Sequence, residues 1–474
     1  MNLDVYNTHM ELYPYTKDDY PWIEDYYTAI DKFTQLEFPC GYIIENGKLY
    51  IPRGSPLKKI EATMKTSAVY KTKSDPRESM SRRFSSLYDL RDDIQQDAVN
   101  FLMNNNRRQL ALNLATGLGK TFVVCYTTTK LNEKTIIITH NEGIKQQWIN
   151  TYHKMFDYRP KNLMNISGSN IIECIMRDEV DSADVYFVNH QTLRSYMTQH
   201  NGYTLHKFFK KIKVGIKVYD ESHLEFANIL LLDFFSNTYR TWYLTATFDR
   251  SDKTESKCFR RAFESVEAFG EEESKDVVER HVIYHVVNIN SRATPSDKAK
   301  VMGWNGMSAI SYGRYAFHDD TKQTAYQSIL AVLEKTKELE GKTLIFVPLI
   351  ETVDELVKKL KLDHPEKTIS SYHSKISKED KDSAIKKDII VSTIRSCGTG
   401  RDIPGLRVLI CAEPIASKVV AQQMFGRLRP YKDKMTYFFD IIDISIPTIN
   451  WWFRARFKKI QELAKDVVYL NLDK

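Results

Sequence analysis

The feature that most constrains this chain is a pair of short apolar runs, each ending in residues suited to phosphate chemistry. The run Gln109 to Leu114 breaks into the loop Ala115 to Thr121, and the run Val214 to Tyr219 is followed by Asp220 and Glu221. A glycine-containing turn from a strand into a helix presents backbone N–H groups to phosphates. A carboxylate at the end of a neighbouring strand suits the metal ion that accompanies them. The pair predicts a parallel α/β sheet with a nucleotide site at one edge.

The same residues predict a hydrolytic mechanism. Lys120 would reach the β and γ phosphates, and the Thr121 hydroxyl and Asp220 would hold Mg²⁺. Glu221 would polarise the attacking water. Each half has an ordinary alternative, because an Asp-Glu pair is often a solvated turn and Leu114 stands where the strict phosphate-loop pattern has Gly. Together, in this order and at the ends of apolar runs, they indicate an NTP hydrolase that uses ATP and Mg²⁺.

The composition is that of a soluble globular protein with two or three domains. Of the 474 residues, 42% are apolar and 27% are charged, and no run of 18 apolar residues predicts a membrane span. The first residues lack the pattern of a secretory signal. The six scattered cysteines contain no Cys-x-x-Cys pair, so a reducing, cytoplasmic compartment is favoured over a zinc site or a disulfide framework.

The net charge of +7 permits nucleic-acid binding without requiring it. The basic clusters Lys207 to Lys213 and Arg454 to Lys459 point more strongly toward such a partner. For either cluster alone, a solvated surface face is the ordinary alternative.

Three segments of the chain differ in pattern. Residues 1–83 are acidic and aromatic and carry Asn46-Gly47 between two apolar runs, a strong β-hairpin signal, which predicts a small α+β accessory domain. Residues 84–275 and 276–474 alternate apolar runs with helical stretches, which predicts two tandem parallel-sheet α/β lobes. Segment 250–325 is polar and is interpreted as the passage between them. The predicted strands are residues 109–114, 135–139, 185–188, 214–219 and 241–244, and then 343–347, 389–393, 408–411 and 436–442.

The second lobe carries residues that would complete an ATP site in a cleft between the lobes. The segment Gln423 to Arg429 offers two arginines, and a guanidinium there would stabilise charge on the γ-phosphate. The alternative is a basic helix end that satisfies its own carbonyls. Thr245 and Thr247, at the end of an earlier strand, would bond toward the Asp220 strand and relay the nucleotide state, unless they simply reflect β-propensity.

Taken in order, these motifs resemble those of the superfamily 2 helicases. Leu114 to Thr121 is similar to motif I, Asp220 to His223 to the DExH form of motif II, and Gln423 to Arg429 to motif VI. The resemblance covers roughly residues 85–445 and implies two RecA-like lobes. It implies catalytic roles for Lys120, Asp220, Glu221, Arg427 and Arg429, and ATP contacts for Gln95 (reading adenine), Thr116, Gly117, Leu118, Gly119, Lys120, Thr121, Gly400 and Asp402. It implies coupling roles for His223, Thr245, Thr247 and Gln423, and DNA contacts for Thr139, His140, Gln191, Thr192, His373, Ser374 and Thr393.

Within the superfamily, the short spacing between motifs and the segment Leu49 to Gly54 resemble the XPB/UvsW type of DNA helicase, including phage and large-virus members. This type implies 3′-to-5′ translocation and remodelling of forked or branched DNA in recombination, repair or replication. A viral member would work in the host cytoplasm. An RNA-directed DExH helicase and an ATP-driven duplex translocase that does not separate strands are the alternatives.

Two departures from the helicase pattern affect single residues. Pro430 stands where motif VI usually has its second arginine, which comes one residue early as Arg429, so Arg427 is the firmer candidate for the arginine finger. Thr139-His140-Asn141 replaces the usual Pro-Thr pair of motif Ia. A DNA contact there would run through the backbone or His140.

Overall fold

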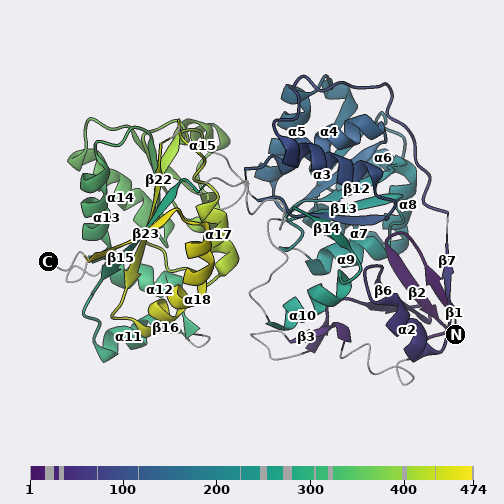
Figure 1. The fold of residues 1–474 in the computed structure, drawn as a ribbon, viewed down its shortest axis with the longest axis horizontal. Helices are drawn as coiled ribbons and strands as arrows, with labels where there is room; N and C mark the ends of the chain where they lie inside the picture. The colour runs from purple at the N-terminus through teal and green to yellow at the C-terminus, as the bar shows by residue number, and fades with distance from the viewer. Residues whose placement is uncertain are drawn as a thin grey trace. The chain divides into compact units, whose positions relative to one another are not determined.

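The computed structural model describes residues 2–16, 26–30, 37–71, 73–115, 117–224, 226–245, 253–270, 280–303, 306–318, 324–397, 403–432 and 434–471. The chain forms two compact units, Met1–Val278 and Glu279–Lys474 (Figure 1). In these ranges, no helix has the length and apolar character needed to span a bilayer.

The first unit is built around a parallel sheet. Among the described residues it has seven strands in the order β10-β11-β9-β12-β13-β8-β14, and all neighbouring pairs are parallel. Parallel strands need crossover helices, which cover both faces of the sheet, so the strands are apolar on both sides. The strands are β8 (Gln109–Leu112), β9 (Thr135–Thr139), β10 (Leu163–Ile166), β11 (Val185–Asn189), β12 (Ile216–Tyr219), β13 (Arg240–Leu244) and β14 (Glu267–Phe269).

Helices pack on both faces of this sheet. Alternate residues of β9 show the division: Ile137 packs into one apolar core, and Ile136 and Ile138 pack into the other. The first core contains α3 (Asp93–Asn104), α4 (Lys120–Leu131) and α5 (Glu142–Met155). The second contains α6 (Ser169–Met176), α7 (His190–His200), α8 (Gly202–Ile212), α9 (Phe226–Phe234) and α10 (Lys253–Ala262).

The N-terminal residues form a second, mostly antiparallel sheet in the order β5-β6-β2-β1-β7. Its hairpin turn is Asn46-Gly47, as predicted, and both residues have positive φ (52° and 71°), as two-residue hairpin turns require. The elements are β1 (Asn2–Val5), β2 (His9–Tyr13), β3 (Thr28–Ile30), β4 (Glu37–Pro39), β5 (Ile43–Glu45), β6 (Lys48–Pro52), α2 (Leu57–Met64) and β7 (Ala68–Tyr70).

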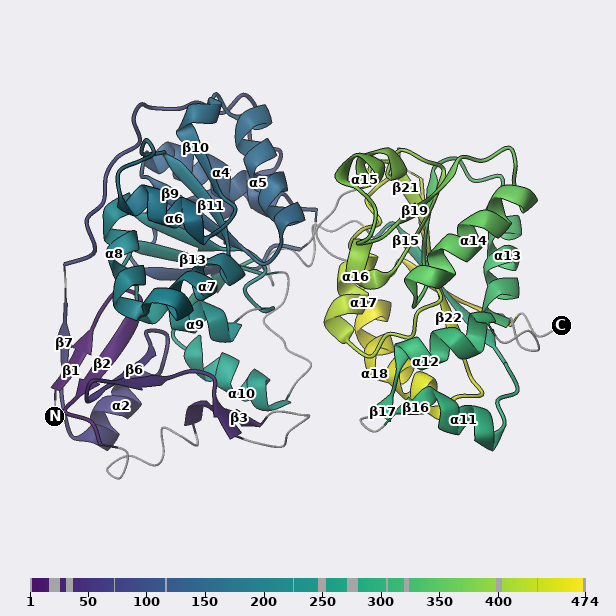
Figure 2. The same ribbon diagram turned by 180° about the vertical axis from the view of Figure 1, so that it is seen from behind.

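This N-terminal sheet shares an apolar core with the lobe beside it. Leu12 and Ile51 belong to the same buried cluster as Phe234 and Phe259, and Figure 2 shows β6 next to α9. The side chain of Gln109 also donates to the backbone carbonyl of Thr8 (3.2 Å). The division of the chain into 1–83, 84–275 and 276–474 stays a prediction.

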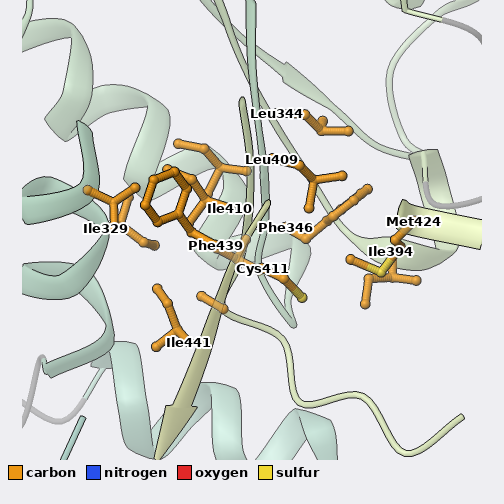
Figure 3. Packing of buried hydrophobic residues seen from close by; sticks show 14 of the residues in the cluster. Ile329, Leu344, Phe346, Ile394, Leu409, Ile410, Cys411, Met424, Phe439 and Ile441 are labelled. Carbon is orange, nitrogen blue, oxygen red and sulfur yellow. The ribbon is translucent and has the colours of Figure 1, made fainter. Parts of the chain in front are cut away.

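The second unit repeats the parallel design. Its described residues form seven parallel strands in the order β19-β20-β18-β21-β22-β15-β23. Ile329 of α13 packs on one face, and Ile394 of α16 and Met424 of α17 pack on the other (Figure 3). The strands are β15 (Val282–Ile289), β18 (Lys342–Phe346), β19 (Ile369–Tyr372), β20 (Ile389–Ser392), β21 (Leu406–Cys411), β22 (Thr436–Asp443) and β23 (Asp466–Asn471), beside a small hairpin of β16 (Met302–Gly303) and β17 (Gly306–Met307). The helices are α11 (Pro295–Val301), α12 (Ala309–Gly313), α13 (Thr324–Thr336), α14 (Ile350–Asp363), α15 (Lys378–Ala384), α16 (Ile394–Cys397), α17 (Lys418–Phe425) and α18 (Pro447–Leu463).

The predicted fold class, two parallel α/β lobes with an N-terminal α+β region, is confirmed. Two details differ. Strand β15 lies in segment 250–325, which was interpreted as an inter-domain passage, because His285 and Asn288 interrupt its apolar run. The phosphate-loop strand β8 and the Asp220 strand β12 are not neighbours, since β13 lies between them.

Candidate nucleotide and nucleic-acid site

The loop from β8 to α4 has the geometry of a phosphate cradle. Gly117 and Gly119 have φ of 99° and 83°, a region that side chains with a Cβ rarely adopt, and Gly119 is the N-cap of α4. The first N–H groups of a helix have no acceptor within the helix, so those at the start of α4 face the loop. The Lys120 Nζ donates to the carbonyl of Leu114 (2.8 Å). The ammonium group therefore lies against the loop, where it would also contact a bound phosphate. Thr116 lies outside the described residues.

Gln95 braces this loop from α3. Its Nε2 donates to the carbonyl of Leu118 (3.0 Å), and its Oε1 accepts from the backbone N–H of Arg91 (2.9 Å). A Cβ at position 119 would lie 2.5 Å from the Gln95 Nε2, so the Gln95 amide would have to move, and the positive φ of 83° is the main reason for glycine there. The structure thus brings the predicted adenine-reading residue onto the phosphate loop.

Asp220 stands directly after β12 with both oxygens oriented. The Trp148 indole Nε1 donates to Oδ2 (2.6 Å), and the Glu221 backbone N–H donates to Oδ1 (2.9 Å). Burial raises the pKa of the Asp220 carboxyl, and the bond from Trp148 and the charge of Lys120 oppose that rise. A carboxylate fixed in this way suits a role as a metal ligand.

Glu221 has an unusual backbone and an unusual carboxyl group. Its φ of 50° places it in the left-handed region, where the chain turns sharply out of the sheet. Burial raises the pKa of its carboxyl to about 7; the charge of Lys120 lowers it and that of Asp220 raises it further. The Oε2 atom receives no hydrogen bond from a described residue, although the His223 ring lies 3.4 Å away. A carboxylate with one buried oxygen that receives no hydrogen bond from a described residue, and with a pKa near neutrality, suits a general base.

These groups fit ATP and Mg²⁺. The Thr121 hydroxyl is in the first turn of α4, and the Asp220 carboxylate is at the carboxyl end of β12, at the edge of the sheet where α/β proteins bind nucleotides. Hydroxyl and carboxylate oxygens are the ligand types that Mg²⁺ prefers.

His223 and Thr245 join the Asp220 segment to the next strand. The Thr245 hydroxyl and the His223 Nδ1 lie 2.9 Å apart, and both side chains are buried. The Ser222 backbone N–H donates to the carbonyl of Leu244 (2.9 Å). The predicted bond from Thr245 toward the Asp220 segment is therefore present, while Thr247 lies outside the described residues.

The nucleic-acid residues predicted in the first unit differ in exposure. Thr139 is fully buried, and its hydroxyl donates to the Asn189 Oδ1 (2.9 Å), so it can act on a bound strand only by holding its loop. His140, Gln191 and Thr192 are at least partly exposed. The last two lie in the first turn of α7.

In the second unit the predicted contacts follow the carboxyl ends of the strands. Ser374 is exposed after β19, whereas His373 is buried with its Nε2 3.1 Å from the Asp354 Oδ1. Thr393 follows β20 and is buried, and its hydroxyl donates to the Ser396 Oγ (2.9 Å), so it would support a bound strand through its loop. Gln423 lies on α17, and Arg427 and Arg429 follow that helix, all partly exposed. Gly400 and Asp402 lie outside the described residues.

Sequence reasoning missed two residues beside these motifs. Trp148, on α5, donates a hydrogen bond to Asp220, and no local sequence pattern predicts this contact. Glu413, after β21, accepts from the N–H of Ile394 (3.1 Å), and burial raises the pKa of its carboxyl to about 7. A carboxylate directly after an apolar run was the available signal for Glu413.

Two family models match the chain. The model described as type III restriction enzyme, res subunit, matches residues 87–250, and the helicase conserved C-terminal domain matches residues 322–429. Transcript termination protein A18 of Yaba monkey tumor virus (strain VR587) is 24% identical over 345 residues, which are 69% of this chain and 66% of that protein. The match thus spans slightly less than two thirds of that relative's length.

Solved structures share the fold. S. cerevisiae Dbp5 bound to RNA and ADP BeF3 matches with a TM-score of 0.55 and 14% identity over 80% of this chain and 90% of its own. A fragment of a putative HsdR subunit of a type I restriction enzyme from Vibrio vulnificus YJ016 matches with a TM-score of 0.54 and 16% identity. The match covers 81% of this chain and 69% of that fragment. T4 UvsW matches over 100% of this chain and 99% of its own with 13% identity and a TM-score of 0.36.

Proposed function

Because the chain belongs to the superfamily 2 helicases, we propose that it is an ATP-dependent DNA helicase that moves 3′ to 5′ and acts on forked or branched DNA. Recombination, repair and replication produce such structures. The viral relative supports a viral role, with the host cytoplasm as the place of action.

One observation carries the proposal of ATP hydrolysis. Glu221 presents a buried carboxylate oxygen, with a pKa near 7, beside the positioned Asp220 and within the field of Lys120. In the proposed reaction, Glu221 takes a proton from water as that water attacks the γ-phosphate, and Lys120 and the N–H groups of the loop neutralise the phosphate oxygens. Asp220 and Thr121 would hold Mg²⁺, which would supply further charge neutralisation. Arg427 would add a guanidinium from the second unit.

Nucleic acid would cross the carboxyl edges of both sheets. Gln191, Thr192 and His140 in the first unit and Ser374 in the second are exposed enough to meet phosphates. Backbone contacts of this kind give little sequence preference and a strong dependence on salt.

A second candidate is an ATP-driven duplex translocase without strand separation. The match to a restriction-enzyme subunit model supports it, because that model covers the ATP-binding lobe. An RNA-directed helicase would use the same core residues.

The test is the ATPase rate of the full chain with single-stranded, duplex, forked and four-way-junction DNA and with single-stranded RNA. The proposal expects the greatest stimulation by forked or branched DNA, and displacement of a strand from the fork. Greater stimulation by RNA would favour the RNA helicase, and stimulation by duplex without strand displacement would favour the translocase. Glu221→Gln controls for a contaminating ATPase.

A further inference from the structure

One face of helix α18 packs against the rest of the second unit, and side chains on the opposite face are exposed. Ile449, Arg456 and Ile460 are buried. The Arg456 guanidinium donates to the Asp440 carboxylate (2.7 Å) and to the carbonyl of Ile415 (2.8 Å). A buried ion pair with an additional backbone bond fixes the rotation of the helix about its axis.

The open face combines a tryptophan with two cations. Trp451 is 67% exposed, and Arg454 and Lys458 are also exposed. At 100° per residue, the three side chains lie within about 60° of one another around the helix. No acidic side chain among the described residues forms an ion pair with Arg454 or Lys458, and the nearby Glu462 lies 3.7 Å from Lys459.

Apolar side chains extend this face at the start of the helix. Ile444 and Met302 are 43% and 44% exposed. The Met302 sulfur lies 3.8 Å from the Thr448 hydroxyl, and both views of the fold show β16 beside α18 (Figures 1 and 2). Together these side chains form the Trp451 surface, which consists of Met302, Ile444, Trp451, Arg454 and Lys458.

The Trp451 surface begins at the same edge of the sheet as the proposed nucleic-acid contacts. Ile444 directly follows β22, and Thr393 directly follows β20. Three inter-strand steps separate these strands in the sheet order, which is about 14 Å. That distance corresponds to about four stacked nucleotides. A strand that passes over the end of β20 can therefore reach Ile444, where the Trp451 surface begins.

We propose that the Trp451 surface binds a single strand of nucleic acid beyond the segment held by the helicase motifs, with one base stacked on Trp451 and phosphates paired with Arg454 and Lys458. Two exposed cations that form no ion pair with a described residue, beside an exposed aromatic ring, fit this ligand, because the cations attract phosphates and the ring stacks on a base. The inference rests on the proposed function, since it extends the same nucleic-acid path.

The test measures the affinity of the full chain for labelled single-stranded DNA of about 4 to about 20 nucleotides. We expect Trp451→Ala to weaken binding of the long strands by about tenfold, the effect of losing one base–aromatic stack, and to leave the short strands unchanged. Trp451→Phe should restore most of the loss. The double variant Arg454→Glu/Lys458→Glu should also reduce the dependence of log affinity on log salt by at least about 1.4.

Matched controls are Leu362→Ala and Lys361→Glu, which change exposed residues at the end of α14 in the same unit. Equal binding of long strands by wild type and Trp451→Ala would overturn the inference, and so would equal weakening at every length. Neither result would affect the proposed function. That proposal fails instead if the wild-type chain binds no strand of any length and its ATPase is not stimulated.

Discussion

At the scale of single residues, the site is organised by burial. Asp220 and Glu221 are adjacent in sequence, yet their carboxylates have different hydrogen-bond partners. Asp220 accepts hydrogen bonds on both oxygens, which suits a metal ligand, whereas an oxygen of Glu221 receives none from the described residues. Between the two residues the chain turns sharply, because Glu221 has a left-handed φ of 50°, and its backbone N–H becomes a donor to Asp220.

The raised pKa of Glu221 predicts the pH dependence of hydrolysis. Because the carboxyl has a pKa of about 7 and only the carboxylate can accept a proton, kcat/KM for ATP should fall about tenfold per pH unit below about pH 7. The measurement is a rate profile between about pH 5.5 and about 8.5. A flat profile across this range would show that Glu221 is not the titrating base.

Trp148 provides a second prediction at this scale. Trp148→Phe removes the donor to the Asp220 Oδ2, which raises the pKa of that carboxyl and weakens its hold on Mg²⁺. The Mg²⁺ concentration for half-maximal ATPase should rise by about tenfold or more. Trp242→Phe is the matched control, because Trp242 is buried in the same core and its Nε1 has no hydrogen-bond partner among the described residues. Equal responses of the two variants would remove Trp148 from the metal site.

At the scale of elements, a buried polar network joins β12, β13 and α9. The Asp233 carboxylate accepts from the Lys217 ammonium (2.5 Å) and from the hydroxyls of Tyr219 (2.8 Å) and Tyr243 (2.6 Å). Gln109 of β8 extends the network by donating to the Tyr243 hydroxyl (2.7 Å). The network fixes the strand that carries Asp220 relative to its neighbours.

Removing one partner of that network should be costly. Asp233→Ala leaves the fully buried Lys217 without its counter-ion, so we expect a loss of about 3–5 kcal/mol in the free energy of unfolding. The double variant Lys217→Met/Asp233→Leu should cost much less, because no unpaired charge remains. Urea unfolding measures both variants. A single variant as stable as the double variant would contradict this account.

The sequence predicted the central elements better than the peripheral ones. Strand β9 has the predicted bounds, because five consecutive apolar or β-branched residues leave little choice. Strand β19 (Ile369–Tyr372), at a sheet edge, was missed because its two serines hide the pattern. The phosphate loop and the Asp-Glu pair were found because their chemistry is local. The Trp148 contact was not found, since it depends on how α5 packs.

At the scale of the whole molecule, the proposed site draws on both units. Lys120 and Glu221 belong to the first unit, whereas Arg427 belongs to the second. The N-terminal sheet shares its core with the first unit, so a chain starting near Ser85 would expose the apolar face around Phe234 and Phe259. Point variants therefore test the role of the N-terminal sheet better than truncation does.

Arg427 is predicted to act on ATP bound by the first unit. Arg427→Ala should lower kcat by about 10³-fold, as removal of a finger arginine does, with a much smaller change in ATP affinity. Arg429→Ala should cost less, because Arg429 stands one residue before the usual position. Steady-state kinetics and nucleotide binding check both variants. Equal and small losses would separate these arginines from the reaction.

The most direct test of the central claim is the ATPase rate of Glu221→Gln with saturating single-stranded DNA, measured together with its affinity for ATP in Mg²⁺. We expect a rate lower by about 10²–10⁴-fold, the contribution of a general base, and an affinity close to that of the wild-type chain, because Lys120, Thr121 and Asp220 are retained. Hydrolysis at close to the wild-type rate would contradict the account.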